Sequence, residues 1–510
     1  MSLYALAVWI LVRLEWAILA YFLLVNGWYL VLLASAGAEM RRHVLLSRGQ
    51  ARWKMLGSRV VPGISMLAPA YNEAATIGQS VRALLALYYP NLEVVVVNDG
   101  SKDDTMAVLI DEFDLAPIHP IYPKRILSAE VVALYRSRTF PTLLVVDKRN
   151  GGKADALNAG LNLAAGELVC AIDADTLIEP DALIRMVRPF IDDDGVIAAG
   201  GTIRVANASR VESGRVVETR VPRRGLPGFQ VVEYLRAFLF GRLGWNRLGG
   251  NLIISGAFGL FRRDAVIAAG GYLEETVGED MELVLRLRRR GYERKGPHRV
   301  DFIPDPVAWT EAPSTFRVLG RQRDRWQRGL TDVLWRHRGL FFNPRYGRMG
   351  MIVYPYFVLN ELLAPVVEAV GFLGVVLGLM LNALDWPFAI LFFLTAYGLG
   401  ALLTLTALVL EEMNFHRYHT FGDRVMLVVW ALLENLGYRQ LTVIWRLKGM
   451  WNYVRGSRAW GKMDRAGFRT GENGRGQDGR GQVTGDRGQQ AGSVPAPVAA
   501  PPSIPSGAPR

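Results

Sequence analysis

The sequence has almost no cysteine, because Cys170 is the only one among its 510 residues. A single cysteine cannot form an internal disulfide, and it excludes a metal site built from several thiolates. Cys170 lies in an apolar run, so we expect a buried strand residue in a reducing compartment. Histidine is also scarce, with six residues, none of which lies in a motif. Carboxylates are therefore the expected acid–base groups.

Acidic residues are fewer than basic ones: 47 Asp and Glu against 59 Lys and Arg, a formal net charge of +12. This charge favours anionic partners such as nucleic acid, lipid headgroups or phosphorylated substrates. Hydrophobic residues make up 51% of the chain, which is high for a soluble enzyme and indicates membrane segments. Because the basic residues cluster beside apolar stretches, we expect a lipid surface and no nucleic acid as partner.

Residues 17–36 form a nearly unbroken apolar run. A helix of this length, about 30 Å, matches one hydrocarbon thickness. A cleaved signal peptide is the alternative, since residues 34–36 resemble a cleavage site, but the run is too long and no clear basic segment precedes it. Arg41 and Arg42 follow the run instead, which places the next part of the chain in the cytoplasm. We therefore expect a transmembrane anchor over residues 1–45.

Residues 46–313 alternate between short β-branched runs and helical patterns. The expected strands are 64–69, 94–97, 143–146 and 168–172, and the expected helices are 76–87, 105–113 and 153–165. Continuous apolar strands alternating with helices predict an α/β domain with a parallel sheet covered on both faces. Such sheets bind ligands at the carboxyl ends of their strands. Carboxylates follow all four of these strands, which indicates a site at that edge.

The rest of the chain is amphipathic, then apolar, then polar. We expect amphipathic interfacial helices over residues 314–365, and two transmembrane helices over 366–411. Residues 412–469 read as an amphipathic or membrane helix and a basic cytoplasmic segment, on the same side as the α/β domain. Residues 470–510 are rich in Gly, Gln, Pro and Ser, which predicts a disordered tail.

Asp173 and Asp175 end the fourth expected strand. Alternate strand residues project to the same side, so the two carboxylates can converge on one cation. Oxygen ligands of this kind suit Mg²⁺ or Mn²⁺ that bridges a diphosphate. An ordinary acidic turn is the alternative, because a pair with this spacing is common.

Three further strings carry chemistry. Gly151-Gly152-Lys153 opens a helix, where backbone amides and an ammonium can attract phosphate; a plain surface loop is the alternative. Gly278-Glu279-Asp280 precedes another helix, and its acids could simply cap that helix. Gln-Arg-Asp-Arg-Trp at 322–326 offers guanidinium forks for phosphate and an indole face for a sugar. Its alternative is a basic helix on the lipid surface.

The order of these strings resembles glycosyltransferase family 2, in the processive branch with cellulose, hyaluronan and poly-N-acetylglucosamine synthases. The resemblance covers residues 63–329. It implies a Rossmann-like GT-A catalytic domain inserted between transmembrane and interfacial helices, and an inverting transfer from a UDP-sugar. The matching strings are Ala68-Pro-Ala-Tyr-Asn-Glu73, Val97-Asn-Asp-Gly-Ser101, Gly151-Gly-Lys-Ala-Asp-Ala-Leu-Asn158, Asp173-Ala-Asp175, Gly278-Glu-Asp280 and Gln322-Arg-Asp-Arg-Trp326.

The resemblance also assigns roles to single residues. It implies nucleotide-sugar binding by Ala70, Tyr71, Glu73, Asp99, Lys153 and Asp173. It implies Asp175 as the ligand of a Mg²⁺ or Mn²⁺ cofactor and Asp280 as the general base. It implies that Gln322, Arg323, Arg325 and Trp326 hold the diphosphate and the acceptor's terminal sugar. This chemistry is sound in its own right, because a metal neutralises a departing diphosphate and a carboxylate takes the acceptor proton.

Two departures from the family's pattern bear on the product. The string Gly278-Glu279-Asp280 stands where cellulose synthases have Thr-Glu-Asp, and no match to the gating loop of bacterial cellulose synthases follows Trp326. Cellulose is therefore disfavoured, and a poly-N-acetylglucosamine or related hexosamine polymer is expected. One alternative is a non-processive transferase that makes a glycolipid on polyprenyl phosphate or another lipid. An alternative of another class is a transporter with a regulatory nucleotide-binding domain.

The expected location follows from these assignments. We expect a multi-pass protein of the inner or plasma membrane, with the catalytic domain in the cytoplasm, where nucleotide sugars are found. The expected partners are a UDP-sugar donor, a polysaccharide or glycolipid acceptor, the lipid bilayer and, as a further candidate, an accessory membrane subunit.

Overall fold

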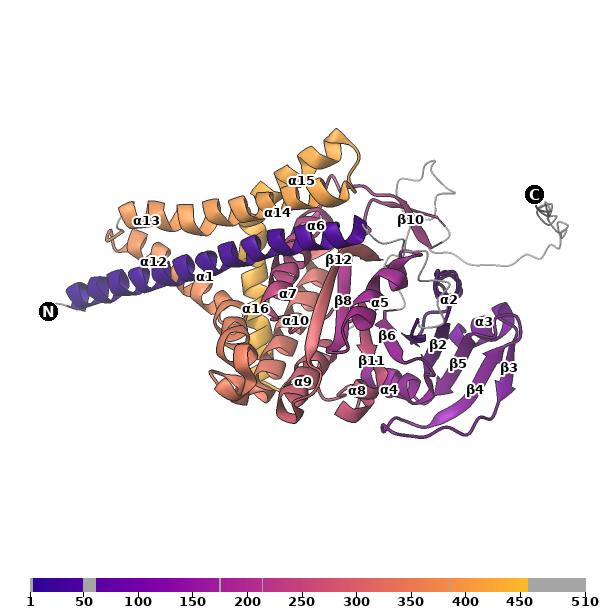
Figure 1. The fold of residues 1–510 in the computed structure, drawn as a ribbon. Coiled ribbons are helices and arrows are strands. Elements are labelled where there is room, and N and C mark those ends of the chain that lie inside the picture. The colour runs from indigo at the N-terminus through magenta and orange to yellow at the C-terminus, as the bar shows by residue number, and fades with distance from the viewer. Residues whose placement is uncertain (1–2, 49–60, 174–175, 213, 385, 457–510) are drawn as a thin grey trace, which may run out of the picture. The chain divides into compact units, whose positions relative to one another are not determined.

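The computed structural model describes residues 3–48, 61–173, 176–212, 214–384 and 386–456 (Figure 1). Its main sheet has ten strands in the order β3-β4-β5-β2-β1-β6-β11-β8-β12-β7. A separate ribbon pairs β9 (Arg210–Glu212) with β10 (Arg215–Glu218). The strands of the main sheet are β1 (Ile64–Ala70), β2 (Leu92–Asp99), β3 (Leu115–Ile118), β4 (Val131–Ser137), β5 (Leu143–Lys148), β6 (Leu168–Ile172), β7 (Leu177–Ile178), β8 (Val196–Val205), β11 (Phe258–Arg262) and β12 (Arg299–Thr310).

The centre of the sheet is parallel, as the sequence predicts. β1 pairs in parallel with β2 and β6, and β2 pairs in parallel with β5, so all four predicted strands are confirmed. The flanks differ from the expectation, because β11 is antiparallel to β6 and β8, and β4 is antiparallel to β3 and β5. The prediction of a parallel sheet is therefore correct for the centre and wrong for the edges.

Helices cover both faces of this sheet, because successive strand residues point to opposite sides. In β2, Val94 and Val96 belong to one hydrophobic core, while Val95 and Val97 belong to the other. The covering helices are α2 (Ile77–Leu85), α3 (Thr105–Glu112), α4 (Lys153–Leu163), α5 (Ala182–Asp192), α8 (Arg263–Ala269) and α9 (Glu279–Arg294). Cys170 is fully buried in the first core, as expected. The layered arrangement places the carboxyl ends of β1, β2, β5 and β6 along one edge.

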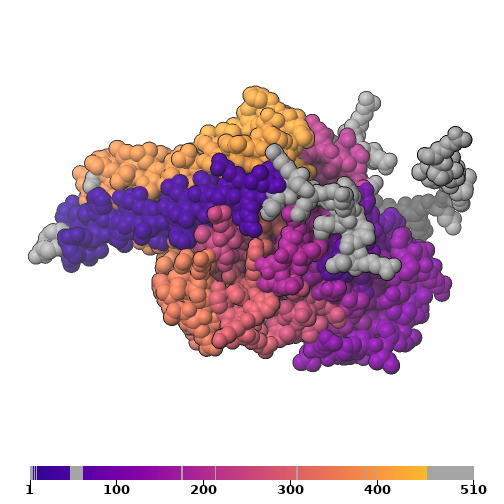
Figure 2. Space-filling model, in the orientation of Figure 1, coloured from indigo at the N-terminus to yellow at the C-terminus, as the bar shows by residue number. Residues whose placement is uncertain are grey.

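The helix α1 (Leu3–Arg48) has 46 residues, which makes it roughly 69 Å long at 1.5 Å per residue. That length is more than twice a hydrocarbon thickness of about 30 Å. Its second half packs on the α/β domain, where the Trp28 and Trp245 rings lie 5.7 Å apart. Its first half lies beside the C-terminal helices (Figure 2), and the Tyr4 hydroxyl donates to the carbonyl of Leu381.

The remaining helices lie beside α1 and on the side of the sheet away from β3 and β4 (Figure 1). Among the described residues, residues 8–45 form one helix that is long and apolar enough to cross a membrane, and the bent pair Met349–Leu362 and Ala364–Met380 becomes a second if counted as one span. The expected tail, 470–510, lies outside the described residues. The helices other than α1 and those that cover the sheet are α6 (Leu226–Leu235), η2 (Arg236–Arg242), α7 (Leu243–Leu248), α10 (Phe316–Arg336), η3 (Arg338–Leu340), η4 (Pro344–Tyr346), η5 (Met349–Val353), α11 (Tyr354–Tyr356), η6 (Phe357–Leu362), α12 (Ala364–Met380), α13 (Trp386–Phe393), η7 (Leu394–Gly398), α14 (Leu399–Phe415), α15 (Phe421–Leu433), η8 (Glu434–Tyr438) and α16 (Arg439–Val454).

Candidate active site

Asp99 is the last residue of β2, and its buried carboxylate organises the loop that leads into α4. One oxygen accepts from the Lys148 ammonium at 2.5 Å and from the Gly151 amide at 2.9 Å. The other oxygen accepts from the Gly152 amide at 2.8 Å. Gly152 has φ of +92°, a conformation that favours glycine. In this structure Asp99 therefore holds the Gly151-Gly152-Lys153 loop in place, and its contact with the nucleotide stays a prediction.

The loop after β1 is tied to the loop after β2. The Glu73 amide donates to the Thr105 hydroxyl at 2.8 Å, and the Asn72 amide donates to the Ser101 hydroxyl at 3.0 Å. Ala70 is buried at the strand end, whereas Tyr71 is 45% exposed. An exposed aromatic ring on a braced loop is available to stack on a planar ligand.

Lys153 joins two of the motifs at the centre of the site. Its ammonium lies 2.5 Å from Asp173 at the end of β6 and 3.6 Å from Glu279 at the start of α9. Burial opposes the charge on Lys153, but Asp173 and Glu279 together raise its pKa above the ordinary value. Burial also raises the pKa of Glu279, although Lys153 opposes that shift. The site thus keeps one fixed positive charge between two carboxylates.

Asp280 is held in place by backbone amides. Its Oδ2 accepts from the Gly256 amide at 2.9 Å, and its Oδ1 accepts from the Met281 amide at 2.8 Å. A Cβ added at Gly256 would lie 3.2 Å from Asp280 and 3.5 Å from the Lys153 ammonium. A side chain at position 256 would therefore touch both groups, and Asp280 would have to shift by a few tenths of an ångström.

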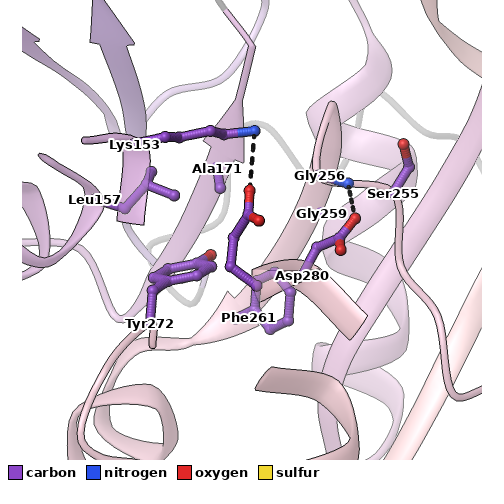
Figure 3. Close-up of a pocket in the computed structure, with 10 residues that line it drawn as sticks. Lys153, Leu157, Ala171, Ser255, Gly256, Gly259, Phe261, Tyr272 and Asp280 are labelled. Atoms are coloured by element: carbon purple, nitrogen blue, oxygen red, sulfur yellow. Dashed lines mark hydrogen bonds and ion pairs between the residues drawn. The ribbon is translucent and has the colours of Figure 1, made fainter. Parts of the chain in front are cut away.

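These groups line one small cavity (Figure 3) of about 10 Å³, which holds about one water molecule. Its polar lining comes from Lys153, Ser255, Glu279 and Asp280, with the ring of Tyr272 on one side. Sequence analysis missed Ser255 and Tyr272, because each is an isolated polar residue outside a motif. The close spacing of Lys153, Glu279 and Asp280 around this cavity supports a shared role in one reaction.

The helix α10 brings the Gln322–Trp326 motif to the same region. A Cβ at Gly278 would lie 3.1 Å from the Cα of Gly329, so the backbone before α9 touches α10. Arg323 is buried, pairs with Glu233 at 2.6 Å, and its guanidinium carbon lies 4.4 Å from the Trp326 ring centroid. Arg323 therefore orients Trp326, whose side chain is 43% exposed, while Gln322 is buried.

The metal expectation concerns Asp173 and Asp175. Asp173 stands at the end of β6 with its side chain 30% exposed, and Asp175 lies outside the described residues. Within the described ranges, no group of three His, Cys, Asp or Glu side chains gathers to hold a metal. Mg²⁺ is often bound by one or two carboxylates, with water and substrate phosphates as its other ligands. The oxygen donors of this motif fit that pattern.

The ordered motifs, the braced strand-end loops and the carboxylates around Lys153 define a glycosyltransferase site. The chain belongs to glycosyltransferase family 2: the family model described as "Glycosyltransferase like family 2" matches residues 62–329. Its α/β domain accordingly has a GT-A-like fold, with a sheet that is parallel at its centre. The chain is thus an enzyme of sugar transfer.

Two relatives illustrate this membership. The probable glycosyltransferase YdaM of Bacillus subtilis is 25% identical over 424 residues, which cover 78% of this chain and 89% of that protein. The poly-beta-1,6-N-acetyl-D-glucosamine synthase of Staphylococcus aureus is 30% identical over 275 residues. That match covers 54% of this chain and 56% of the synthase, so it spans only about half of the relative's length.

Among the solved structures that match the chain is the mannosyltransferase PcManGT from Pyrobaculum calidifontis in complex with GDP-Man and Mn²⁺. It is 18% identical to this chain and has a TM-score of 0.45. The match covers 81% of this chain and 99% of that structure.

Proposed function

We propose that this enzyme transfers a sugar from a UDP-sugar, with UDP-N-acetylglucosamine as the first candidate, to a growing polysaccharide. The observation that carries the proposal is the meeting of Lys153, Glu279 and Asp280 in one cavity. The Lys153 ammonium also lies 2.5 Å from Asp173, and the backbone before Glu279 touches α10. Such a site offers a cation for a diphosphate and a carboxylate for an acceptor hydroxyl. The match to the Staphylococcus aureus synthase supports a hexosamine polymer as product.

In the proposed reaction, the acceptor hydroxyl oxygen bonds to the sugar's anomeric carbon as the bond from that carbon to the diphosphate oxygen breaks. Asp280 accepts the hydroxyl proton, and the amides of Gly256 and Met281 hold its carboxylate in position. Lys153 balances negative charge on the diphosphate. A Mg²⁺ or Mn²⁺ ion held by Asp173 and Asp175 would supply Lewis-acid stabilisation of the leaving group. Attack opposite the leaving group inverts the anomeric configuration.

We also propose a multi-pass location in the plasma membrane, with the catalytic domain in the cytoplasm. The support is apolar surface on the helices beside α1: Phe372, Met380 and Trp386 are 66%, 78% and 65% exposed. Exposed apolar side chains clustered on neighbouring helices are typical of a membrane-facing surface. The first half of α1, together with α12 and the α13–α14 segment, would then lie in the bilayer.

Reporter fusions test this topology. Fusions after Ser47 and after Gly471 are both expected to report the cytoplasm, because positive charge at Arg41 and Arg42 and at 446–469 favours that side. A periplasmic signal at Ser47 would contradict the topology. It would also contradict the donor assignment, since nucleotide sugars are cytoplasmic.

The function itself is tested by incubating purified membranes with a panel of UDP-sugars and measuring UDP release and product size. The proposal expects UDP release with one hexosamine donor and a product of many sugar units. A single sugar on a lipid would establish the glycolipid alternative instead. Absence of UDP release with every donor would overturn the proposal.

Replacing Trp326 tests polymer formation. Trp326→Ala removes a partly exposed indole face that a terminal acceptor sugar can pack against. We expect loss of long product while binding of the UDP-sugar changes less than about twofold, because the ring lies on α10 and not on a donor loop. Trp335→Ala is the matched control, since Trp335 is 62% exposed on the same helix. Long product from Trp326→Ala would refute acceptor binding by this residue.

A further inference from the structure

Lys148 is a buried charged residue that the proposed reaction does not use. It is the last residue of β5, and its side chain is completely buried. Its ammonium lies 2.5 Å from Asp99 Oδ1 and 2.7 Å from the Arg149 carbonyl oxygen, and it also pairs with Asp155. An ammonium has three N–H groups, so each of them faces an oxygen. Lysine is almost never fully buried unless it is paired, which ties the burial of Lys148 to these two carboxylates.

The pairing of β2 with β5 explains how Lys148 reaches Asp99. The two residues are partners in the register of this parallel pair. Successive side chains of a strand alternate between the faces of a sheet, and partners in register point to the same face. Asp155 joins them from the first turn of α4, and its other oxygen accepts from the Ala129 amide at 2.7 Å. Lys148 thus connects two strand ends with the start of a helix.

The ion pair between Lys148 and Asp155 spans the glycine loop, residues 149–152. Lys148 precedes this loop and Asp155 follows it, so their contact holds the two ends of the loop together. Asp99 holds the middle, because its oxygens accept from the amides of both glycines at 2.9 and 2.8 Å. A Cβ added at Gly151 would collide with the Asp155 carboxylate, so the turn lies directly against this ion pair.

The glycine loop determines where Lys153, the first residue of α4, enters the cavity (Figure 3). Glycine loses more conformational freedom on ordering than any other residue, so two glycines in succession need contacts that hold them. A loop that is already ordered avoids this entropic cost when a ligand binds. Lys148 also offsets the negative charges of Asp99 and Asp155, which would otherwise oppose an anionic ligand beside the loop.

We propose that Lys148 is a positioning residue for the nucleotide-sugar donor: by pairing with Asp99 and Asp155, it fixes the glycine loop so that Lys153 meets the diphosphate. This inference rests on the proposed function, because it needs a diphosphate donor. Lys148 itself does not touch the donor, since its side chain is enclosed by protein. Its replacement should therefore weaken donor binding and leave the proton transfer to Asp280 nearly unchanged.

The first test replaces Lys148 with methionine in the full-length enzyme. Methionine keeps an unbranched stem but leaves two buried carboxylates without their cation, so thermal unfolding is measured to establish that the variant is folded. Lys148→Met should raise donor KM by about ten- to a hundredfold, the fold-change that corresponds to one lost hydrogen bond to a charged group. At saturating donor, kcat should stay close to that of the wild type. Calorimetry with UDP should show the same weakening.

Asp155→Asn tests the ion pair from its other end, with little change in shape. Asparagine removes the charge that pairs with Lys148, while its oxygen can still accept from the Ala129 amide. Donor KM should rise by about three- to tenfold, because a neutral oxygen replaces a charged one and the pair between Lys148 and Asp99 remains. If Lys148→Met does not fold, this variant decides the question.

The matched control is Lys124→Met, which removes an exposed lysine outside the glycine loop and should behave as the wild type. An unchanged donor KM in folded Lys148→Met, or in Asp155→Asn if the first variant does not fold, would overturn the proposal. Lys148 would then contribute to stability alone. A lower kcat with unchanged donor KM would overturn it as well. Wild-type enzyme that neither binds nor releases UDP would instead refute the proposed function, whatever the variants do.

Discussion

Asp280→Asn is expected to reduce sugar transfer by about 10²-fold or more, the usual scale of general base catalysis. An acceptor hydroxyl is a weak nucleophile at neutral pH, so a basic group must take its proton as the new bond forms. The amide of asparagine keeps the shape of the carboxylate, but its single oxygen can accept from only one of the Gly256 and Met281 amides, and it cannot accept that proton. The loss should appear in kcat, with donor KM nearly unchanged.

The geometry around Asp280 makes this variant informative. Its neighbour Glu279 faces Lys153 at 3.6 Å, whereas Asp280 is held by amides on the opposite side of the cavity (Figure 3). Glu279→Gln should therefore disturb the Lys153 charge and raise donor KM more than it lowers kcat. Wild-type transfer by Asp280→Asn together with an inactive Glu279→Gln would identify Glu279 as the base.

The parallel centre of the sheet is predictable because its strands are buried on both faces. Val94–Val97 and Leu168–Ile172 are continuous apolar runs bounded by polar residues, and such runs have few alternatives in an α/β pattern. The flanking strands β8 and β12 lack this continuous apolar pattern. β8 contains two adjacent glycines and Arg204, and β12 contains Pro304 and Pro306. Their place in the sheet depends on pairing with each other and with β11, which no local pattern reveals.

The candidate site, like the sheet, is predictable from the sequence only in part. Its motifs can be predicted because each places several polar residues in one short string, and their order indicates the family. Partners of single side chains cannot be predicted in this manner. Asp99 is predicted at the nucleotide, and the contacts of its two oxygens with the Gly151 and Gly152 amides are visible only in the structure. Ser255 is a single polar residue in an apolar segment, and only the folded chain brings it to the cavity that Asp280 also lines.

Asp175→Asn is expected to abolish turnover, with a loss of about 10³-fold or more. A metal bound to a leaving diphosphate contributes several kcal/mol, and about 1.4 kcal/mol corresponds to a tenfold change in rate. An amide lacks the anionic oxygen that Mg²⁺ and Mn²⁺ prefer. Since the position follows β6 in the sequence and the substitution keeps a polar side chain of the same size, thermal unfolding should match the wild type.

Three measurements test the metal hypothesis. Excess chelator should stop the wild-type enzyme, and added Mg²⁺ or Mn²⁺ should restore it. Calorimetry with UDP should show metal-dependent binding in the wild type and little dependence in Asp175→Asn. Asp194→Asn is the matched control, because Asp194 is fully exposed and pairs only with Arg262 among the described residues. Full activity of Asp175→Asn, or of the wild type in chelator, would refute a metal-bridged diphosphate and leave Lys153 as the main charge at the leaving group.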